Sequence, residues 1–307
     1  MKRMEMVAIP GGTFFMGCQD FYPEEAPVHE ETVAAFQIDR YPVTNEEFAA
    51  FVRDTGYVTL AERTPNRADY PDVPAEALVA GSLVFHRTAG PVDLTDWSQW
   101  WTYIPGALWR YPLGPGSSID AIGDHPVVHV AYEDASAYAQ WAGKALPTEA
   151  EWEFAARGGL DRAVFTWGNE MAPGGKVMAN TWQGEFPWQN LLTDGYERTS
   201  PVDAFPPNGY GLYDMAGNVW QWTCDWYRSA HAPAAKSVCC SVSARASKDD
   251  SYDAGQPQLR IPRKVLKGGS HLCAPNYCLR FRPAARSPQM IDSSMSHLGF
   301  RCVLRMH

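Results

Sequence analysis

Hydrophobic positions recur at helical spacing in three short stretches of the chain. Residues 44–47 (Thr-Asn-Glu-Glu) form a capping-box pattern, in which the first and last side chains each accept the other residue's backbone N–H, and an apolar stripe follows. The same signal recurs at residues 148–151 (Thr-Glu-Ala-Glu), and Gly158 marks the expected end of that helix. A third helix is predicted over residues 133–142. We assign all three helices to the scaffold.

Extended runs in the remaining sequence are short and separated by turn chemistry. Strands are predicted at residues 126–130, 265–268 and 299–303, where β-branched and other apolar residues cluster. Residues 234–262 are polar, contain Ser and Asp, and show no periodicity, which predicts a flexible surface insertion. No linker or internal repeat divides the chain. The pattern therefore predicts one irregular α+β domain over residues 1–307 with little regular secondary structure.

Composition supports a folded, loop-rich protein. Hydrophobic residues make up 45% of the chain and aromatic residues 13%, with 25 Gly and 24 Pro. Large rings can stabilise loops because each buries about 150–250 Å². The net charge of -9 and the absence of a basic face argue against nucleic-acid binding. The densest basic segment, residues 280–286, is interleaved with apolar residues, which indicates part of a site or a buried polar network.

The N-terminal residues contain no apolar run long enough for a signal peptide or a transmembrane helix. We therefore expect a cytoplasmic protein that does not contact membranes. Seven cysteines without a secretion signal do not indicate a disulfide framework, so the thiols are expected to be reduced. Cys239 and Cys240 are adjacent in sequence, and no role can be assigned to them.

Cys273 and Cys278 carry the clearest candidate chemistry. They follow two glycines, and Pro-Asn between them allows a turn, so the two sulfurs can converge. Converging thiols can form a disulfide, bind a soft metal, or act as nucleophile and resolving thiol. Zinc usually takes four ligands, whereas copper(I) is soft and favours thiolates. His271 is a further possible donor, but its position two residues before Cys273 favours a hydrogen-bonding role.

The surroundings of this pair resemble a known family. Gly-Gly-Ser-His-Leu-Cys at 268–273, Tyr-Cys at 277–278, Arg-Phe-Arg-Pro-Ala-Ala-Arg at 280–286 and Gly-Phe-Arg-Cys at 299–302 resemble the C-terminal signature of bacterial-type formylglycine-generating enzymes, also called sulfatase-modifying factors. Further blocks, such as Leu-Pro-Thr-Glu-Ala-Glu-Trp-Glu at 146–153, extend the resemblance through nearly the whole chain. It implies a sulfatase-modifying-factor fold, a C-type-lectin-like variant.

The resemblance also implies an activity, oxidation of the cysteine in a Cys-x-Pro-x-Arg motif of sulfatases to Cα-formylglycine. The implied requirements are O₂, copper(I) and an external reducing thiol. The substrate would be an unfolded or nascent sulfatase polypeptide, and a groove for a flexible peptide suits a monomer. The implied site consists of Cys273 and Cys278 as copper ligands, with Ser270, Trp220 and Tyr277 beside them. Trp100, Trp101, Pro105 and Trp109 are candidates for the groove or, equally, for the core.

Two structural calcium sites are implied as well. The first would use the side chains of Asn180 and Asp194 with the carbonyls of Thr181 and Tyr196. The second would use Asp214, Gly217, Val219 and Gln221. Calcium binds six to eight oxygens of these chemical types. Many relatives have Asn and Glu at the outer positions of the second site, where this chain has Asp214 and Gln221, so the second site is the weaker expectation.

Three other functions remain open from the sequence. A non-catalytic, lectin-like binding domain of the same fold would be favoured if either cysteine of the pair were missing. A sulfoxide synthase would be expected to carry an extra N-terminal helical domain with iron-binding histidines. A thiol–disulfide oxidoreductase would use the same cysteines and need no metal.

Overall fold

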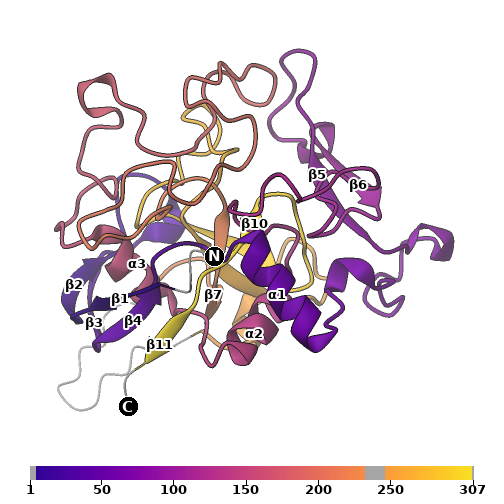
Figure 1. Cartoon of the computed structure of the whole chain (residues 1–307), viewed down its shortest axis with the longest axis horizontal. Coiled ribbons are helices and arrows are strands. Elements are labelled where there is room, and N and C mark those ends of the chain that lie inside the picture. The colour runs from indigo at the N-terminus through magenta and orange to yellow at the C-terminus, as the bar shows by residue number, and fades with distance from the viewer. Residues whose placement is uncertain (1–4, 232–245, 306–307) are drawn as a thin grey trace.

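A computed structural model gives the structure of residues 5–231 and 246–305. Within these residues, three α-helices and four small sheets are joined by long irregular segments (Figure 1). The low content of regular structure agrees with the prediction. None of the helices in this part of the chain is both long and apolar enough to cross a membrane.

The three predicted helices are present. They are α1 (Asn45–Thr55), α2 (Tyr132–Trp141) and α3 (Glu149–Arg157). Both capping boxes form as expected: the Thr44 and Thr148 side chains each accept a backbone N–H from the glutamate three residues later. Gly158 ends α3 in the left-handed region, at φ 58°. Local sequence was sufficient to predict these elements because caps act within one turn.

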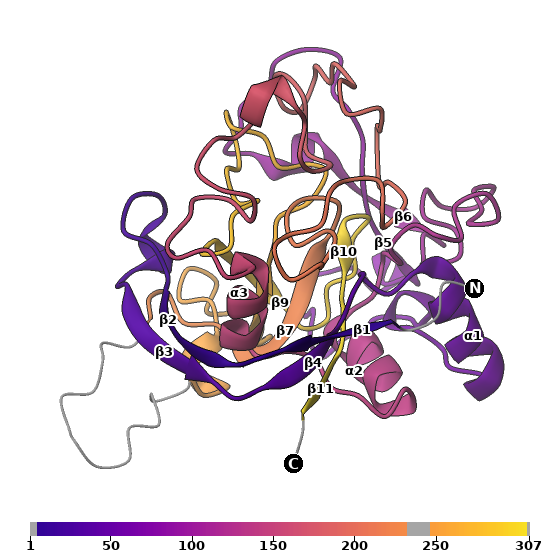
Figure 2. The same cartoon turned by 60° about the vertical axis from the view of Figure 1, so that its left-hand side comes forward.

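One sheet ties the two ends of the described chain together. Its order is β1–β4–β11, and its strands are Met6–Ile9, Phe36–Asp39 and Val303–Arg305. A separate pair joins β2 (Gly12–Met16) to β3 (His29–Val33). Figure 2 shows α3 lying between this pair and the β7–β8 strands, and it contacts all four.

The second sheet carries the segment that contains the cysteine pair. Its order is β10–β7–β8–β9, and its strands are Leu298–Gly299, Trp220–Trp226, Arg263–Lys267 and Arg286–Met290. The chain leaves β8 at Lys267, passes through both cysteines and returns at Arg286 in β9. A further pair, β5 (Gly81–Phe85) and β6 (Trp101–Pro105), lies apart from this sheet (Figure 1).

Two strand predictions differ from the structure. Residues 126–130 form no strand, only a bridge between Pro126 and Thr44, because His129 adopts φ 59° and interrupts the extended backbone. Residues 299–303 are split between β10 and β11, and the side chain of Arg301, between the two strands, is buried and donates to Gln221. The strand predicted at 265–268 is confirmed as β8.

The predicted insertion at 234–262 lies partly outside the described residues, and so do Cys239 and Cys240. Its described part, residues 246–262, contains one short 3₁₀ turn at Asp249–Ser251 and no strand or α-helix.

Cys273 and Cys278 lie in the largest apolar cluster of the described chain, together with Trp220 and Phe281. The candidate chemistry is therefore part of the core.

Candidate active site

Two glycines shape the cysteine loop, which we define as residues 268–278. Gly268 and Gly269 both adopt left-handed backbone conformations, with φ +95° and +69°. A Cβ on Gly268 would lie 3.0 Å from the Trp152 ring, and one on Gly269 would lie 2.9 Å from the backbone nitrogen of Phe281. Only glycine fits both the dihedral angles and the space, so the loop can fold back against its own continuation.

The loop brings the two cysteine sulfurs together. Cys273 Sγ and Cys278 Sγ lie 3.0 Å apart, and both residues are buried, with 1% and 9% of their surface exposed. Both are free thiols. The Ser270 backbone N–H points at Cys273 Sγ over 3.4 Å, and the Cys278 N–H donates to Ala274 O at 2.7 Å, which closes the turn between the cysteines. The predicted convergence of the thiols is thus present in the structure.

The two thiols have opposite acid–base properties. Burial raises the pKa of Cys273 well above its ordinary value. The pKa of Cys278 is lowered, first by its hydrogen bond with Cys273, against the effect of burial, and then by the charge and hydrogen bonds of Arg280. Of the two thiols, Cys278 is therefore the one that loses its proton more readily.

Three aromatic residues, Tyr277, Phe186 and Trp100, pack together beside the sulfurs, and we call them the aromatic wall. The Tyr277 ring stacks on Phe186 with centroids 4.5 Å apart and meets Trp100 edge-on at 5.6 Å. Tyr277 is 38% exposed, so it presents one face to solvent at the edge of a buried aromatic cluster. Trp220 is only 5% exposed and packs in the same cluster as both cysteines. The Ser270 hydroxyl accepts the Leu272 N–H at 3.2 Å within the loop.

The candidate groove tryptophans have different positions. Trp100 and Trp109 are 0% and 1% exposed, so they are core residues, and the groove interpretation is wrong for them. Trp101 is half-buried and its ring packs at a tilt against the His297 ring, with centroids 4.8 Å apart, while Pro105 is exposed. His271 is buried and its Nδ1 lies 2.8 Å from Asn218 O, in the hydrogen-bonding role expected for it.

The sequence did not predict the partners of the arginine segment, residues 280–286. The partners of Arg280 and Arg282 come from residues 21–25, which we call the N-terminal hook. The guanidinium of Arg280 lies 3.8 Å from the centroid of the Tyr22 ring and donates to Glu24 Oε1 at 2.6 Å. Arg282 forms a buried two-point ion pair with Glu25. These contacts join residues more than 250 positions apart in sequence.

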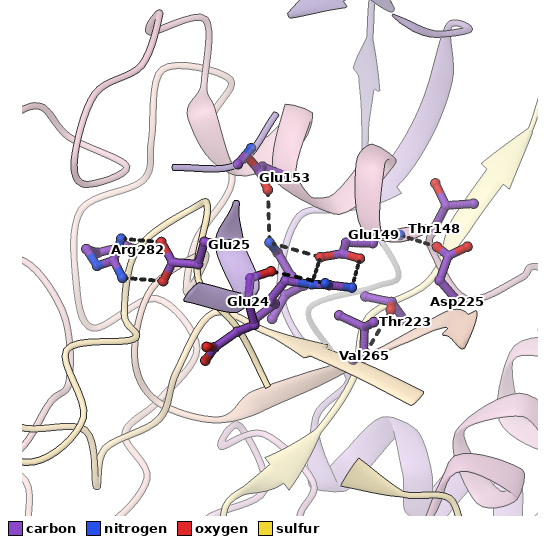
Figure 3. A network of polar contacts seen from close by, with 12 residues as sticks. Glu24, Glu25, Thr148, Glu149, Glu153, Thr223, Asp225, Val265 and Arg282 are labelled. Carbon is purple, nitrogen blue, oxygen red and sulfur yellow. Dashed lines mark hydrogen bonds and ion pairs between the residues drawn. The ribbon is translucent and has the colours of Figure 1, made fainter. Parts of the chain in front are cut away.

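The hook and the arginine segment belong to a larger buried polar network (Figure 3). Arg286 donates to both carboxylate oxygens of Glu149 at 2.7 and 2.8 Å, and Lys267 reaches Glu153 at 3.0 Å. In Figure 3, Glu25 pairs with Arg282 to one side, while Glu149 and Glu153 pair with basic side chains of the protein in the middle of the view. The interpretation of residues 280–286 as part of a buried polar network is therefore confirmed.

Comparison with known proteins assigns the family. Residues 1–306 match the sulfatase-modifying factor enzyme 1-like domain. The chain is also 54% identical over 301 residues to the formylglycine-generating enzyme of Mycobacterium tuberculosis, a match that covers 97% of each protein. The chain belongs to the formylglycine-generating enzyme family. The predicted α+β fold of sulfatase-modifying-factor type is likewise confirmed.

Other relatives show how much the family varies. The chain is 39% identical to a Mus musculus protein named inactive C-alpha-formylglycine-generating enzyme 2, over 97% of this chain and 84% of that protein. The solved structure of PvdO from Pseudomonas aeruginosa has a TM-score of 0.63 and 26% identity, and it covers 98% of this chain and 94% of that one. Because the family includes a member named as inactive, the activity of this chain has to be argued from its own residues.

Two side-chain oxygens of the first predicted calcium set have no hydrogen-bond donor among the described residues. Asn180 Oδ1 and Asp194 Oδ2 are buried, and neither accepts a hydrogen bond from any residue that the structure describes. Burial raises the pKa of Asp194, although the backbone N–H groups of Tyr196 and Thr181 oppose this shift. An unpaired buried acceptor is costly, and a hard cation would satisfy both oxygens. These residues fit calcium.

The second predicted calcium set is already paired within the protein. Gln221 Oε1 accepts from Trp152 Nε1 at 2.9 Å and from Arg301 Nε at 2.6 Å. Its amide nitrogen donates to Asp214 O at 2.7 Å, and Asp214 Oδ2 accepts from Asn218 at 2.8 Å. The Arg301 guanidinium already supplies positive charge at this position. The backbones of Gly217 and Val219 lie nearby in sequence, but the Gln221 side chain does not fit as a calcium ligand, and we propose no ion there.

The cysteine pair fits a soft ion that needs few ligands. Across residues 5–231 and 246–305, no group of three or more His, Cys, Asp or Glu side chains is placed to hold a metal. A four-ligand zinc site therefore has no counterpart in this part of the chain. Two buried thiols 3.0 Å apart match the preference of copper(I) for sulfur.

Proposed function

We propose that this protein oxidises the cysteine of Cys-x-Pro-x-Arg motifs in sulfatase polypeptides to Cα-formylglycine in a copper(I)-dependent reaction. The observation that carries the proposal is the buried pair of free thiols, 3.0 Å apart, in a chain of this family. The balanced reaction converts –CH₂–SH, O₂ and two reductant thiols into –CHO, hydrogen sulfide, water and one disulfide of the reductant. Oxygen is reduced by four electrons, two from the substrate carbon and two from the external thiols.

The chain's residues have distinct roles in this proposal. Cys273 and Cys278 would hold the copper(I) ion, which when bound supplies electron transfer to O₂. Because both sulfurs are buried, the protein keeps bulk water from the reacting atoms. Tyr277 is the exposed aromatic side chain next to Cys278 and would contact the incoming peptide. Trp220 and Ser270 would border the sulfur pair on its interior side, since Trp220 packs in the same apolar cluster as both cysteines and the Ser270 N–H points at Cys273 Sγ.

Calcium has a structural role in this proposal. It would be held by Asn180 and Asp194 with the carbonyls of Thr181 and Tyr196. The support is the pair of donorless buried oxygens on the two side chains. This site is separate from the sulfur pair in chemistry, since oxygen ligands select a hard ion and thiolates select a soft one.

Mass spectrometry of a synthetic peptide tests the catalytic proposal. The peptide contains Cys-x-Pro-x-Arg and is incubated in air with copper-loaded protein and a reducing thiol. The expected product has lost the mass that separates –CH₂–SH from –CHO. Conversion should disappear in Cys273→Ala and in copper-free protein, and should persist in Cys224→Ala, because that thiol lies outside the pair.

Two of the alternatives, the binding domain and the thiol–disulfide oxidoreductase, predict different results. A non-catalytic binding domain would leave the peptide mass unchanged even when the protein is folded and copper-loaded. A thiol–disulfide oxidoreductase would act without copper and would yield disulfides in place of an aldehyde. Either result would contradict the proposed reaction.

A further inference from the structure

The two cysteines are held in place by different parts of the chain. Cys273 is fixed on both sides by nearby backbone: its N–H donates to Ser270 O at 2.9 Å and its carbonyl accepts the Trp182 N–H at 3.0 Å. Cys278 has a local contact on one side, from its N–H to Ala274 O. Immediately after Cys278, the chain is held by the N-terminal hook.

Tyr22 of the hook contacts both residues that follow Cys278. Its hydroxyl oxygen accepts the Leu279 backbone N–H at 2.9 Å. Its ring lies beneath the Arg280 guanidinium at 3.8 Å, and Glu24 holds the far side of the same guanidinium at 2.6 Å. Arg280 is also among the groups that lower the pKa of the Cys278 thiol, through its charge and its hydrogen bonds. Tyr22 therefore contacts the residue that directly follows Cys278, a proposed metal ligand.

The hook is itself held by further contacts, so it can fix the position of the residues after Cys278. The Glu25 side chain forms the buried ion pair with Arg282, and the Glu25 carbonyl accepts the Cys18 N–H at 3.1 Å. Arg282 also donates from Nε to Leu279 O at 2.8 Å. Both backbone polar groups of Leu279 are thus fixed from outside the cysteine loop, the N–H by Tyr22 and the carbonyl by Arg282.

We propose that Tyr22 is a positioning residue for the sulfur pair: by holding Leu279 and Arg280, it fixes Cys278 Sγ next to Cys273 Sγ and preorganises the two sulfurs for one soft ion. This inference rests on the proposed copper(I) function. Preorganisation strengthens binding because the sulfurs lose less freedom when the ion is bound. The hydroxyl oxygen of Tyr22 is the atom that matters most, since phenylalanine keeps the ring beneath Arg280 and removes only the acceptor.

The test measures copper(I) affinity in the folded protein at 25 °C, by competition with bicinchoninic acid, a chromogenic copper(I) chelator. Tyr22→Phe is expected to weaken binding about tenfold, because the part-buried Leu279 N–H loses its acceptor. Glu24→Gln is expected to weaken it about threefold, since Arg280 loses a partly exposed ion pair. Tyr252→Phe is the matched control: Tyr252 also lies under an arginine, Arg260, at 5.5 Å, but in the described chain its hydroxyl accepts no backbone N–H next to either cysteine, and its effect should stay within about twofold.

Thermal melting and the ultraviolet copper–thiolate band separate the possible results. A Tyr22→Phe protein that melts earlier but binds copper(I) as tightly as wild type would overturn the inference, because Tyr22 would then act only on stability. If Tyr22→Phe does not fold, unchanged affinity in folded Glu24→Gln would overturn it. A wild-type protein without the band would overturn the copper assignment itself, whereas a wild-type band with equal affinity in Tyr22→Phe overturns this inference alone.

Discussion

Glu153 and Lys267 form an ion pair that excludes water: Oε2 and Nζ lie 3.0 Å apart, and both side chains are fully buried. Glu153 also accepts from Arg157 Nη2 at 2.7 Å and from the Gly17 N–H at 2.9 Å. The pair joins α3 to the last residue of β8, directly before the cysteine loop. The position of the loop therefore depends on charges buried in the core.

Lys267→Met is expected to lower the free energy of unfolding by about 3–5 kcal/mol, because it leaves a buried carboxylate without its main partner. Urea unfolding followed by tryptophan fluorescence measures the change. Arg53→Met is the control, since Arg53 and Asp54 form an exposed pair and should contribute less than about 1 kcal/mol. A loss no larger than that of the control would contradict the importance of the buried network.

Asp214 should make stability fall as pH rises. Burial raises the pKa of Asp214 to about 7, against the lowering effects of Asn218 and Arg301. A carboxyl group with a raised pKa in the folded state stabilises the fold below its unfolded pKa, and this contribution is lost as pH rises through about 7. Asp214→Asn should therefore be close to wild type at pH 4.5 and more stable at pH 8, by about 2–4 kcal/mol.

The measurement for Asp214→Asn is the free energy of unfolding at both pH values, in the presence of a calcium chelator. Asp120→Asn, an exposed aspartate, serves as the control. If the free energies of unfolding of wild type and Asp214→Asn differ by the same amount at pH 4.5 and at pH 8, the raised pKa of Asp214 is contradicted. A calcium-dependent loss of stability in Asp214→Asn would instead indicate that an ion binds at the second set of residues.

The first calcium set predicts a thermal shift. Removal of calcium with a chelator should lower the melting temperature of wild type, because an ion at one hundred times its dissociation constant stabilises the fold by about 2.7 kcal/mol. Asp194→Asn should melt at the same temperature with and without calcium, while Asp120→Asn should keep the wild-type response. Differential scanning fluorimetry with added calcium measures this difference, and a calcium response in Asp194→Asn as large as in wild type would reject the site.

Tyr277 should act on the peptide more than on the fold. Tyr277→Ala removes the exposed face of the aromatic wall and is expected to reduce kcat/KM for the Cys-x-Pro-x-Arg peptide about tenfold or more, mainly by raising KM. Tyr277→Phe keeps the stacking on Phe186 and should retain most of the activity. Tyr103→Ala, at a similarly exposed tyrosine on β6, is the comparison. Equal KM values in Tyr277→Ala and wild type would show that the peptide does not contact this ring.

Short-range features of the fold could be predicted from the sequence. The capping boxes at Thr44 and Thr148 act over three residues, and the turn between Cys273 and Cys278 closes within its own sequence. Their physics is local, so the pattern was sufficient. The strand expected at 126–130 was wrong because His129 adopts a positive φ, which nothing in the neighbouring residue types indicates.

Long-range features could not be predicted in the same way. The contact between Tyr22 and Leu279 spans 257 residues and follows no periodicity. The burial of Trp100 and Trp109 depends on rings from distant segments, such as Phe186 against Trp100 and Phe48 against Trp109. The basic segment at 280–286 could be recognised as unusual, but its acidic partners became apparent only from the fold.

The separation of the hook from the cysteine loop also has a consequence for synthesis of the chain. Tyr22 emerges from the ribosome 257 residues before Leu279, a delay of roughly 13 to 50 seconds at ordinary elongation rates. The sheet that contains β11 cannot close until Val303–Arg305 has followed. Until Val303–Arg305 has been synthesised, the core that surrounds the two thiols is incomplete, so the proposed copper(I) site can form only after these residues have left the ribosome.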